Sequence, residues 1–204
     1  LSDVTLNTVV NPPHKATSLI IFPTIEIACE AVQIMRHEPV SAVELLDRQS
    51  LKSVENATGV PPFIKTLPDG CCALLVETQT LTKEELNTNV EEITGSIKHI
   101  QTTLPFLFTT DPKEQAAFWK IRQEALPTVA GLRETGTTAV IEDVCFPVDP
   151  IAKAVTDLRE VLHRNHYDDA GIFGHALEGN LHFMFNQDFQ TKSEVERFHK
   201  FMDE

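Results

Sequence analysis

Apolar and polar residues along the chain follow two periods, one typical of strands and the other of helices. Short apolar runs rich in β-branched residues predict strands. They lie at residues 17–22, 40–46, 72–78, 139–146, 171–175 and 180–185, with a further short strand at 106–108. Apolar residues three and four positions apart predict helices between the strands. The clearest stripes are Leu86, Val90, Ile93 and Ile97, and Ile151, Val155, Leu158 and Leu162.

Capping residues and prolines place the ends of these helices. The expected starts are Thr24 for a helix that Pro39 stops, Thr82–Glu85 and Ser193–Glu196 as capping boxes, Asp111–Pro112, and Asp149–Pro150. A short helix and a loop fill residues 50–69, and a loop at 127–136 follows the helix that begins near Asp111. No glycine, asparagine or proline closes the last helix, so we expect the natural chain to continue beyond Glu204.

The order of these elements predicts the fold class. Strands and helices alternate, but the hairpin at 171–185 and the short connections favour antiparallel pairing. We therefore expect an α+β fold built on the split βαβ pattern of ferredoxin-like folds, in two such halves. Helices should cover one face of the antiparallel sheet.

Composition limits the possible partners and the cellular compartment of the protein. The chain has 204 residues and a net charge of -13, which argues against nucleic acid as a partner. No apolar run reaches the roughly 20 residues that span a bilayer, and the start lacks the basic region of a signal peptide. The four cysteines form no C-x-x-C pair, which favours reduced thiols and a cytoplasmic protein, and no zinc ribbon.

The segment GHALEGNLHF at 174–183 places two histidines on either side of a turn. With Glu178 and Gly179 at the turn centre, His175 directly faces His182, with Cβ atoms about 4.5–5.5 Å apart. Two imidazoles in this position could share one divalent metal such as zinc, and a structural pair of histidines is the alternative. Alternation assigns Leu181, Phe183 and Phe185 to the core face, and Phe173 and Met184 to the face of the histidines.

Arg122 borders the apolar stripe of the helix that begins near Asp111. A guanidinium at that position needs an acceptor. It could clamp the carboxylate of an anionic substrate, or form an ion pair with a neighbouring acidic residue. Glu44 and Asp47 are interpreted as caps of the following helix, and Glu142 and Asp143 as adjacent strand residues without an assigned role.

Four segments together resemble a known family. GHALEGNLHF resembles the G-H-x-G-D-G-N-L-H motif in the C-terminal cap domain of FAD-linked oxidases of the vanillyl-alcohol oxidase type. AVELLDRQSL, FWKIRQEALP and IEDVCFPVDPI follow the order of the family's other signatures. The chain looks most similar to the fused FAD and iron–sulfur oxidoreductases, which resemble D-lactate and D-2-hydroxyglutarate dehydrogenases.

The resemblance implies roles for four residues. His175 and His182 match metal ligands, Arg122 matches the residue that holds the substrate carboxylate, and Asn180 matches an asparagine near flavin and substrate. The family's third metal ligand and catalytic histidine belong to an E-H-G motif that does not occur by Glu204. The resemblance therefore assigns no catalytic residue within the chain, and no residue that binds the cofactor.

Departures from the family pattern concern the substrate. Leu177 and Glu178 stand where the motif has glycine and aspartate, and Ile141 stands where the hydroxyglutarate enzymes have a lysine. A second cation for a dicarboxylate is thus missing at that position, which leaves the identity of the 2-hydroxy acid open.

The resemblance implies a substrate or cap domain over residues 1–204, with a flavin-binding domain before it and an active-site segment after it. The whole protein would oxidise a D-2-hydroxy acid by hydride transfer to FAD. A divalent metal would assist, iron–sulfur clusters would lie elsewhere, and the site of action would be cytoplasmic or peripheral to the inner membrane. The chain alone would be inactive. The alternatives are a non-catalytic ferredoxin-like module that binds a small carboxylate or a metal, and a metallohydrolase with a third ligand inside these residues.

Overall fold

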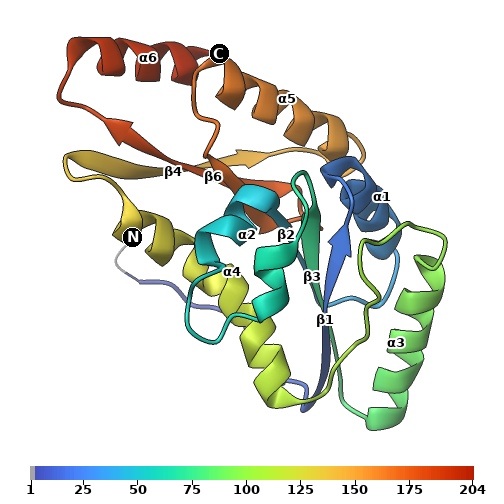
Figure 1. Ribbon diagram of the computed structural model, residues 1–204. Helices are drawn as coiled ribbons and strands as arrows, with labels where there is room; N and C mark the ends of the chain where they lie inside the picture. Colours follow the sequence, from blue (N-terminus) through green and yellow to red (C-terminus); the bar gives the residue numbers. More distant parts are fainter. Residues whose placement is uncertain (1–2) are drawn as a thin grey trace.

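The computed structural model describes residues 3–204 (Figure 1). The strands are β1 (His14–Phe22), β2 (Ala42–Asp47), β3 (Cys72–Thr80), β4 (Thr137–Cys145), β5 (Gly171–His175) and β6 (Asn180–Asp188). The helices are α1 (Ile25–Met35), α2 (Arg48–Val54), η1 (Pro62–Thr66), α3 (Lys83–Ser96), α4 (Pro112–Leu132), α5 (Ile151–Arg164) and α6 (Lys192–Asp203).

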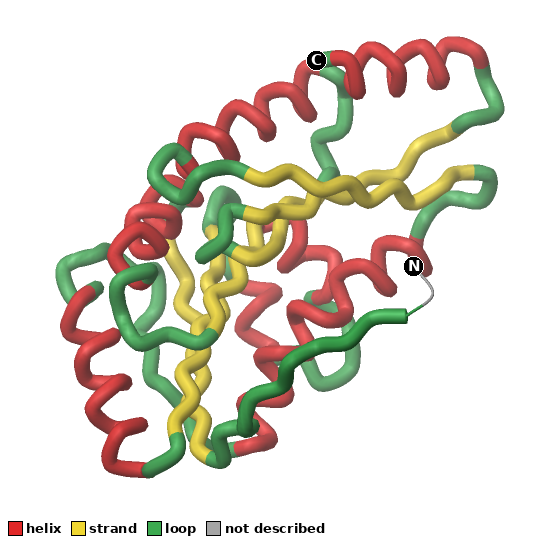
Figure 2. The backbone as a smooth tube through the Cα atoms, turned by 180° about the vertical axis from the view of Figure 1, so that it is seen from behind, coloured by secondary structure: helices red, strands yellow, loops and turns green. Residues whose placement is uncertain are grey.

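Within the described residues the strands form one antiparallel sheet in the order β1-β3-β2-β5-β6-β4. Each half of the chain has the order β-α-β-β-α, with α2 and η1 inserted between β2 and β3 in the first half, and in each half the third strand lies between the first two. This is the split βαβ pattern, so the predicted α+β fold with two such halves is confirmed. The halves meet where β2 pairs with β5. Seen from behind, their strands run in clearly different directions, as the twist of a sheet requires (Figure 2).

Two apolar cores lie on the two faces of the sheet. The larger core contains the buried sides of α1, α3, α5 and α6, the four helices of the repeated halves. The smaller core holds residues of α2 and α4, including Leu51 and Ile121. The prediction that helices cover one face of the sheet is correct for the helices of the two repeated halves. It is wrong for the whole sheet, because the short α2 and the connecting α4 cover the second face (Figure 1).

Several predicted boundaries need correction. Helix α4 continues through Pro127 to Leu132, where a loop was expected, although proline removes a helical hydrogen bond. Residues 106–108 form no strand, and a single bridge between Thr17 and Thr109 replaces it. The Thr82 hydroxyl accepts from the Glu85 N–H at 3.2 Å, as expected, whereas α6 starts after Thr191 without a side-chain cap.

The cysteines are free thiols, and Cys29, Cys71 and Cys72 are buried. Burial raises the pKa of Cys29 to about 12 and also raises the pKa of Cys71, so neither is a ready thiolate. Among residues 3–204, none of the helices combines the length and the apolar character that a bilayer crossing demands.

Candidate functional site

The β5–β6 hairpin depends on two glycines. Gly179 ends the turn at φ +65°, and a Cβ there would overlap the carbonyl oxygen of Phe146, whose N–H donates to Gly179 O at 2.9 Å. Gly174 has φ +150°, and a Cβ would come within 2.6 Å of the Asn180 carbonyl oxygen. Both positions exclude larger residues by conformation and by space, which fixes the hairpin geometry.

The predicted register of this hairpin is wrong by one position in the turn. His175 pairs with Asn180, and His182 pairs with Phe173, because Leu177 and Glu178 occupy the turn centre. The histidines are therefore diagonal neighbours on one face, with ring centroids 5.5 Å apart and planes at 83°. The assignment of faces is confirmed: Leu181, Phe183 and Phe185 join the larger core, and Phe173 and Met184 the smaller one.

Each histidine has a carboxylate on its Nδ1. Strand pairing places Glu44 of β2 opposite His175, and Glu44 Oε1 lies 2.6 Å from His175 Nδ1. Asp143 of β4 lies opposite His182 and contacts its Nδ1. Both bonds leave the Nε2 atoms for a further ligand. Sequence reasoning missed these partners, since it treated Glu44 as a cap and gave Asp143 no role.

Arg122 extends from α4 to the same cluster. Its Nε donates to Glu44 Oε2 at 2.7 Å, and its Cζ lies 4.8 Å from the centroid of the Phe173 ring. The ion pair with a neighbouring acid is thus present. Among the described side chains, neither terminal nitrogen of Arg122 has a hydrogen-bond acceptor. These two donors can bind an anion from outside the chain.

Asn180 lies beside a cleft of about 380 Å³, lined by Ser41, Ala42, Val43, Glu44, His175, Leu177, Glu178 and Asn180. Its side-chain oxygen is buried and has no hydrogen-bond partner. A buried acceptor without a donor is rare in folded proteins. The structure therefore brings the four predicted residues together around Glu44 and Phe173, although their functional roles stay predictions.

The two histidines share two features with zinc ligands, a partner for Nδ1 and the spacing of their rings. A histidine that binds a metal usually donates its other ring N–H to a carboxylate or carbonyl, as the two Nδ1 atoms can here. Two imidazoles on one tetrahedral ion have ring centres roughly 5 Å apart, close to the observed spacing of 5.5 Å. Within residues 3–204 no group of three histidine, cysteine, aspartate or glutamate side chains could hold a metal ion.

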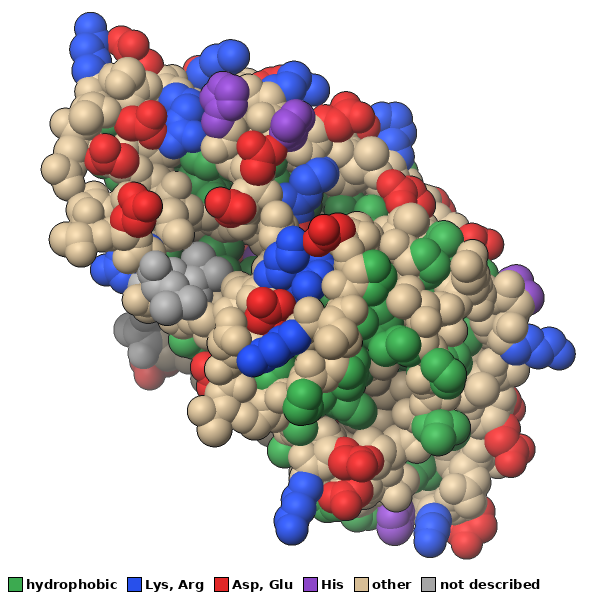
Figure 3. All heavy atoms as spheres, in the orientation of Figure 1, with side chains coloured by type: hydrophobic (Ala, Val, Ile, Leu, Met, Phe, Trp, Pro, Cys, Tyr) green, Lys and Arg blue, Asp and Glu red, His purple; other side chains and the backbone are tan. Residues whose placement is uncertain are grey.

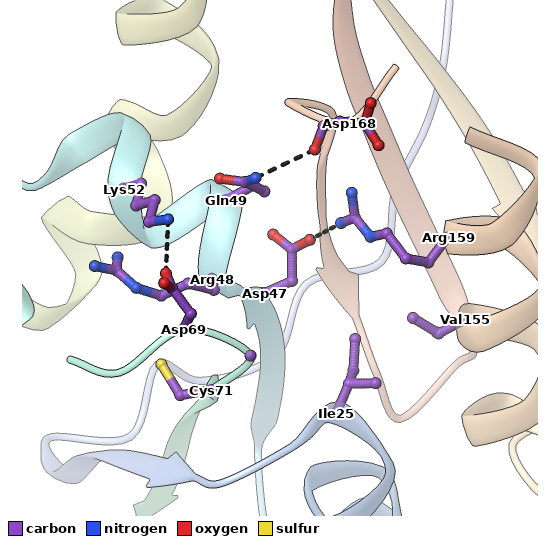
Figure 4. A pocket seen from close by; sticks show the side chains of 11 residues that line it. Ile25, Asp47, Arg48, Gln49, Lys52, Asp69, Cys71, Val155, Arg159 and Asp168 are labelled. Carbon is purple, nitrogen blue, oxygen red and sulfur yellow. Dashed lines mark hydrogen bonds and ion pairs between the residues drawn. The ribbon is translucent and has the colours of Figure 1, made fainter. Parts of the chain in front are cut away.

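A second pocket, beyond the end of β2, has a different character (Figure 4). Lys52 points to Asp69 at 2.8 Å, and Arg159 forms an ion pair with Asp47. These two pairs are satisfied within the protein, whereas Arg48, which also lines the pocket, has two buried nitrogens without a hydrogen-bond partner among the described residues. On the face seen in Figure 3, positive and negative side chains are interspersed, without a continuous field that would attract a charged polymer.

Residues 11–204 match the family described as FAD linked oxidases, C-terminal domain, and the chain belongs to this family. It is 27% identical over 209 residues to the mitochondrial D-lactate dehydrogenase [cytochrome] of Arabidopsis thaliana, covering 99% of this chain and 35% of that protein. It is also 27% identical over 201 residues to glycolate oxidase subunit GlcD of Bacillus subtilis (strain 168), covering 97% of this chain and 40% of that protein.

Solved structures share the fold at low identity. An alkyldihydroxyacetonephosphate synthase matches with a TM-score of 0.64 and 14% identity, covering 96% of this chain and 40% of that one. A p-cresol methylhydroxylase with bound substrate matches with a TM-score of 0.63 and 14% identity, covering 94% and 42%. The chain thus spans well under half the length of these proteins.

Proposed function

We propose that the chain is the substrate or cap domain of an FAD-dependent dehydrogenase that oxidises a D-2-hydroxy acid of the D-lactate or D-2-hydroxyglutarate class. The observation that carries the proposal is the cluster of Arg122, Glu44, His175 and His182 on one face of the sheet. Membership of the family supports FAD and oxidoreductase chemistry. Two relatives are named for lactate and glycolate, both 2-hydroxy acids, which supports the substrate class.

In this proposal the chain binds and orients the substrate. The free terminal nitrogens of Arg122 hold the substrate carboxylate through two parallel hydrogen bonds. Asn180 lines the cleft beside His175 and in this proposal contacts the substrate or the flavin there. Fixed orientation of the reacting carbon lowers the barrier because the ordering entropy is already lost on binding.

His175 and His182 would hold a divalent metal, zinc in our proposal, through their Nε2 atoms. A bound metal of this kind polarises an oxygen of the substrate. FAD, the hydride acceptor, would be held by another domain of the full-length protein, as would any iron–sulfur clusters. The catalytic base is not assigned to these residues, and the location in the cell stays a prediction.

The test uses the full-length flavoprotein and a panel of D- and L-lactate, D- and L-2-hydroxyglutarate and glycolate. We expect anaerobic loss of oxidised-flavin absorbance with one or more D acids and not with their L enantiomers. Absence of flavin reduction by every acid would contradict the proposal. If carboxylates bind without reduction, a non-catalytic binding module is the better description.

Metal content provides a second test. We expect purified full-length protein to carry zinc that the double variant His175→Ala/His182→Ala lacks. The matched control is His163→Ala, because His163 is exposed and forms its ion pair with the exposed Asp168, not with the candidate site. Equal metal content in the double variant and the control would contradict the metal role. Tight stoichiometric zinc in residues 1–204 alone would favour a metallohydrolase.

A further inference from the structure

We propose that Glu44 is a positioning residue that couples the metal-binding and carboxylate-binding parts of the site. The inference rests on the proposed function and deepens it. Glu44 divides its two oxygens: Oε1 contacts His175 Nδ1 at 2.6 Å, and Oε2 contacts Arg122 Nε at 2.7 Å. A single carboxylate therefore sets the orientation of both groups.

The bond to His175 selects a tautomer. An ionised carboxylate only accepts hydrogen bonds, so His175 must carry its proton on Nδ1. In the neutral imidazole with its proton on Nδ1, Nε2 presents a lone pair, which is the form that binds a metal. The side chain of His175 is 49% exposed, so few packing contacts compete with Glu44 in holding the ring.

The bond to Arg122 selects a rotamer of the guanidinium. With Nε bound to Glu44 and Cζ lying over the Phe173 ring, the two terminal nitrogens keep one direction. Glu44 takes only one of the donors, so the bidentate geometry for an external carboxylate is preserved. An ion pair that used both terminal nitrogens would have blocked such binding.

Burial makes Glu44 an effective holder of these groups. It is 5% exposed, and its strand pairs with Leu75 of β3 on one side and His175 of β5 on the other. Glu77 provides a comparison inside the same molecule. It is also 5% exposed and on the same sheet face, but it accepts from Trp119 Nε1 at 2.7 Å and Thr17 Oγ1 at 3.0 Å. Both glutamates fasten α4 to the sheet, and only Glu44 contacts the candidate site.

The substitution Glu44→Gln separates positioning from packing. An amide of the same shape has one acceptor oxygen and one donor nitrogen. It can accept from Arg122 or from His175, while its NH₂ group faces the other partner. If the oxygen stays on Arg122, the NH₂ group donates to His175 Nδ1, and the proton of the ring moves to Nε2. Metal binding at Nε2 is then weakened, because the proton must leave Nε2 first, whereas the opposite orientation disturbs Arg122.

The experiment compares full-length protein carrying Glu44→Gln, the matched control Glu77→Gln, and the wild type. ¹⁵N-histidine labelling reports the tautomer of His175 in the metal-free protein, with the His175→Gln spectrum assigning the signal. Zinc affinity by chelator competition and KM for the substrate are measured on the same samples. We expect Glu44→Gln to shift the tautomer toward Nε2–H or to raise KM about tenfold, and to weaken zinc about 10–100-fold.

The control should lose stability without any of these changes. An unchanged tautomer, zinc affinity and KM in Glu44→Gln would overturn the inference, as would equal losses in Glu77→Gln. Failure of the proposed function is distinguishable, because it would appear in the wild type as absent zinc or absent flavin reduction. The tautomer measurement remains informative in that case, since it needs neither metal nor substrate.

Discussion

Asp47, the last residue of β2, forms an ion pair with Arg159 of α5 and also accepts the Ser50 N–H at 2.8 Å. One buried carboxylate therefore caps α2 and links the two halves of the sheet. The same carboxylate lines the pocket in Figure 4. Asp47→Asn removes the charge and keeps the size of the side chain, so its effect on the free energy of unfolding should depend on pH.

Burial raises the pKa of Asp47, and Arg159 opposes the shift without cancelling it. A group whose pKa is raised by folding contributes stability below its unfolded value of about 3.9, and that contribution is lost as pH rises through the folded value. We expect the wild type to gain stability relative to Asp47→Asn as pH falls below neutral. Asparagine retains the cap, since it is as good an N-cap as aspartate.

Urea unfolding at several pH values measures this difference. Asp69→Asn is the matched control with the opposite sign, because a hydrogen bond from Lys52 lowers the pKa of the exposed Asp69. The free energy of unfolding of the wild type should exceed that of Asp69→Asn by a margin that grows as pH rises from acidic values. A difference for Asp47→Asn that is constant with pH would contradict the expected direction.

Gly179→Ala should disrupt the hairpin that carries both histidines. The new Cβ would overlap the carbonyl oxygen of Phe146 at a backbone φ of +65°, so strain and collision add. We expect a loss of about 2–4 kcal/mol in the free energy of unfolding. Gly95→Ala is the control, since Gly95 in α3 has open space around it and alanine favours helices. Similar stability of the two variants would show that the turn tolerates a side chain.

Trp119→Phe tests the fastening of α4 over the sheet. The variant removes the donor that reaches Glu77 at 2.7 Å and retains most of the aromatic packing. We expect a cost of about 1–3 kcal/mol in thermal or urea unfolding followed by circular dichroism. In a cycle with Glu77→Ala the two costs should not add, because each variant removes the same hydrogen bond from Trp119 Nε1 to Glu77. Full additivity would mean that the indole bond contributes nothing measurable.

Arg122→Lys should affect substrate binding more than stability. Lysine keeps the charge but loses the planar fork and the Nε bond to Glu44. In the full-length enzyme we expect KM for the hydroxy acid to rise at least about tenfold, or about 1.4 kcal/mol of binding. Arg36→Lys is the matched control, because Arg36 forms its ion pair with the exposed Asp149 and not with a residue of the candidate site. An unchanged KM in Arg122→Lys would remove the residue from the substrate site.

Much of the fold follows from local pattern, and the exceptions have physical causes. Apolar period and caps located the strands and most helices, since these signals act within a few residues. Pro127 misled the prediction because a proline weakens a helix by one bond and need not end it. Leu107 is exposed rather than in the strand predicted at 106–108, although that segment is apolar. The helices on the second face of the sheet were not predicted, because the local pattern does not show which face α4 packs against.

The candidate site shows the same division. The two histidines and Arg122 were predicted as site residues because their residue types suit metal and carboxylate binding, and the structure brings them onto one face of the sheet. Glu44 was missed because its contacts join residues 78 and 131 positions away in sequence. The hairpin register was missed because a change of one position in the turn alters every cross-strand pair.

The pairing of β2 with β5 joins the two halves, and Glu44 and His175 face each other across that junction. Neither half contains the cluster by itself. Binding at this site therefore requires both halves to be folded and paired. A chain with only one folded half would show no ligand binding at this site. Ligand binding at this site can thus report that folding is complete, because it distinguishes a sheet with β2 and β5 paired from a chain with only one folded half.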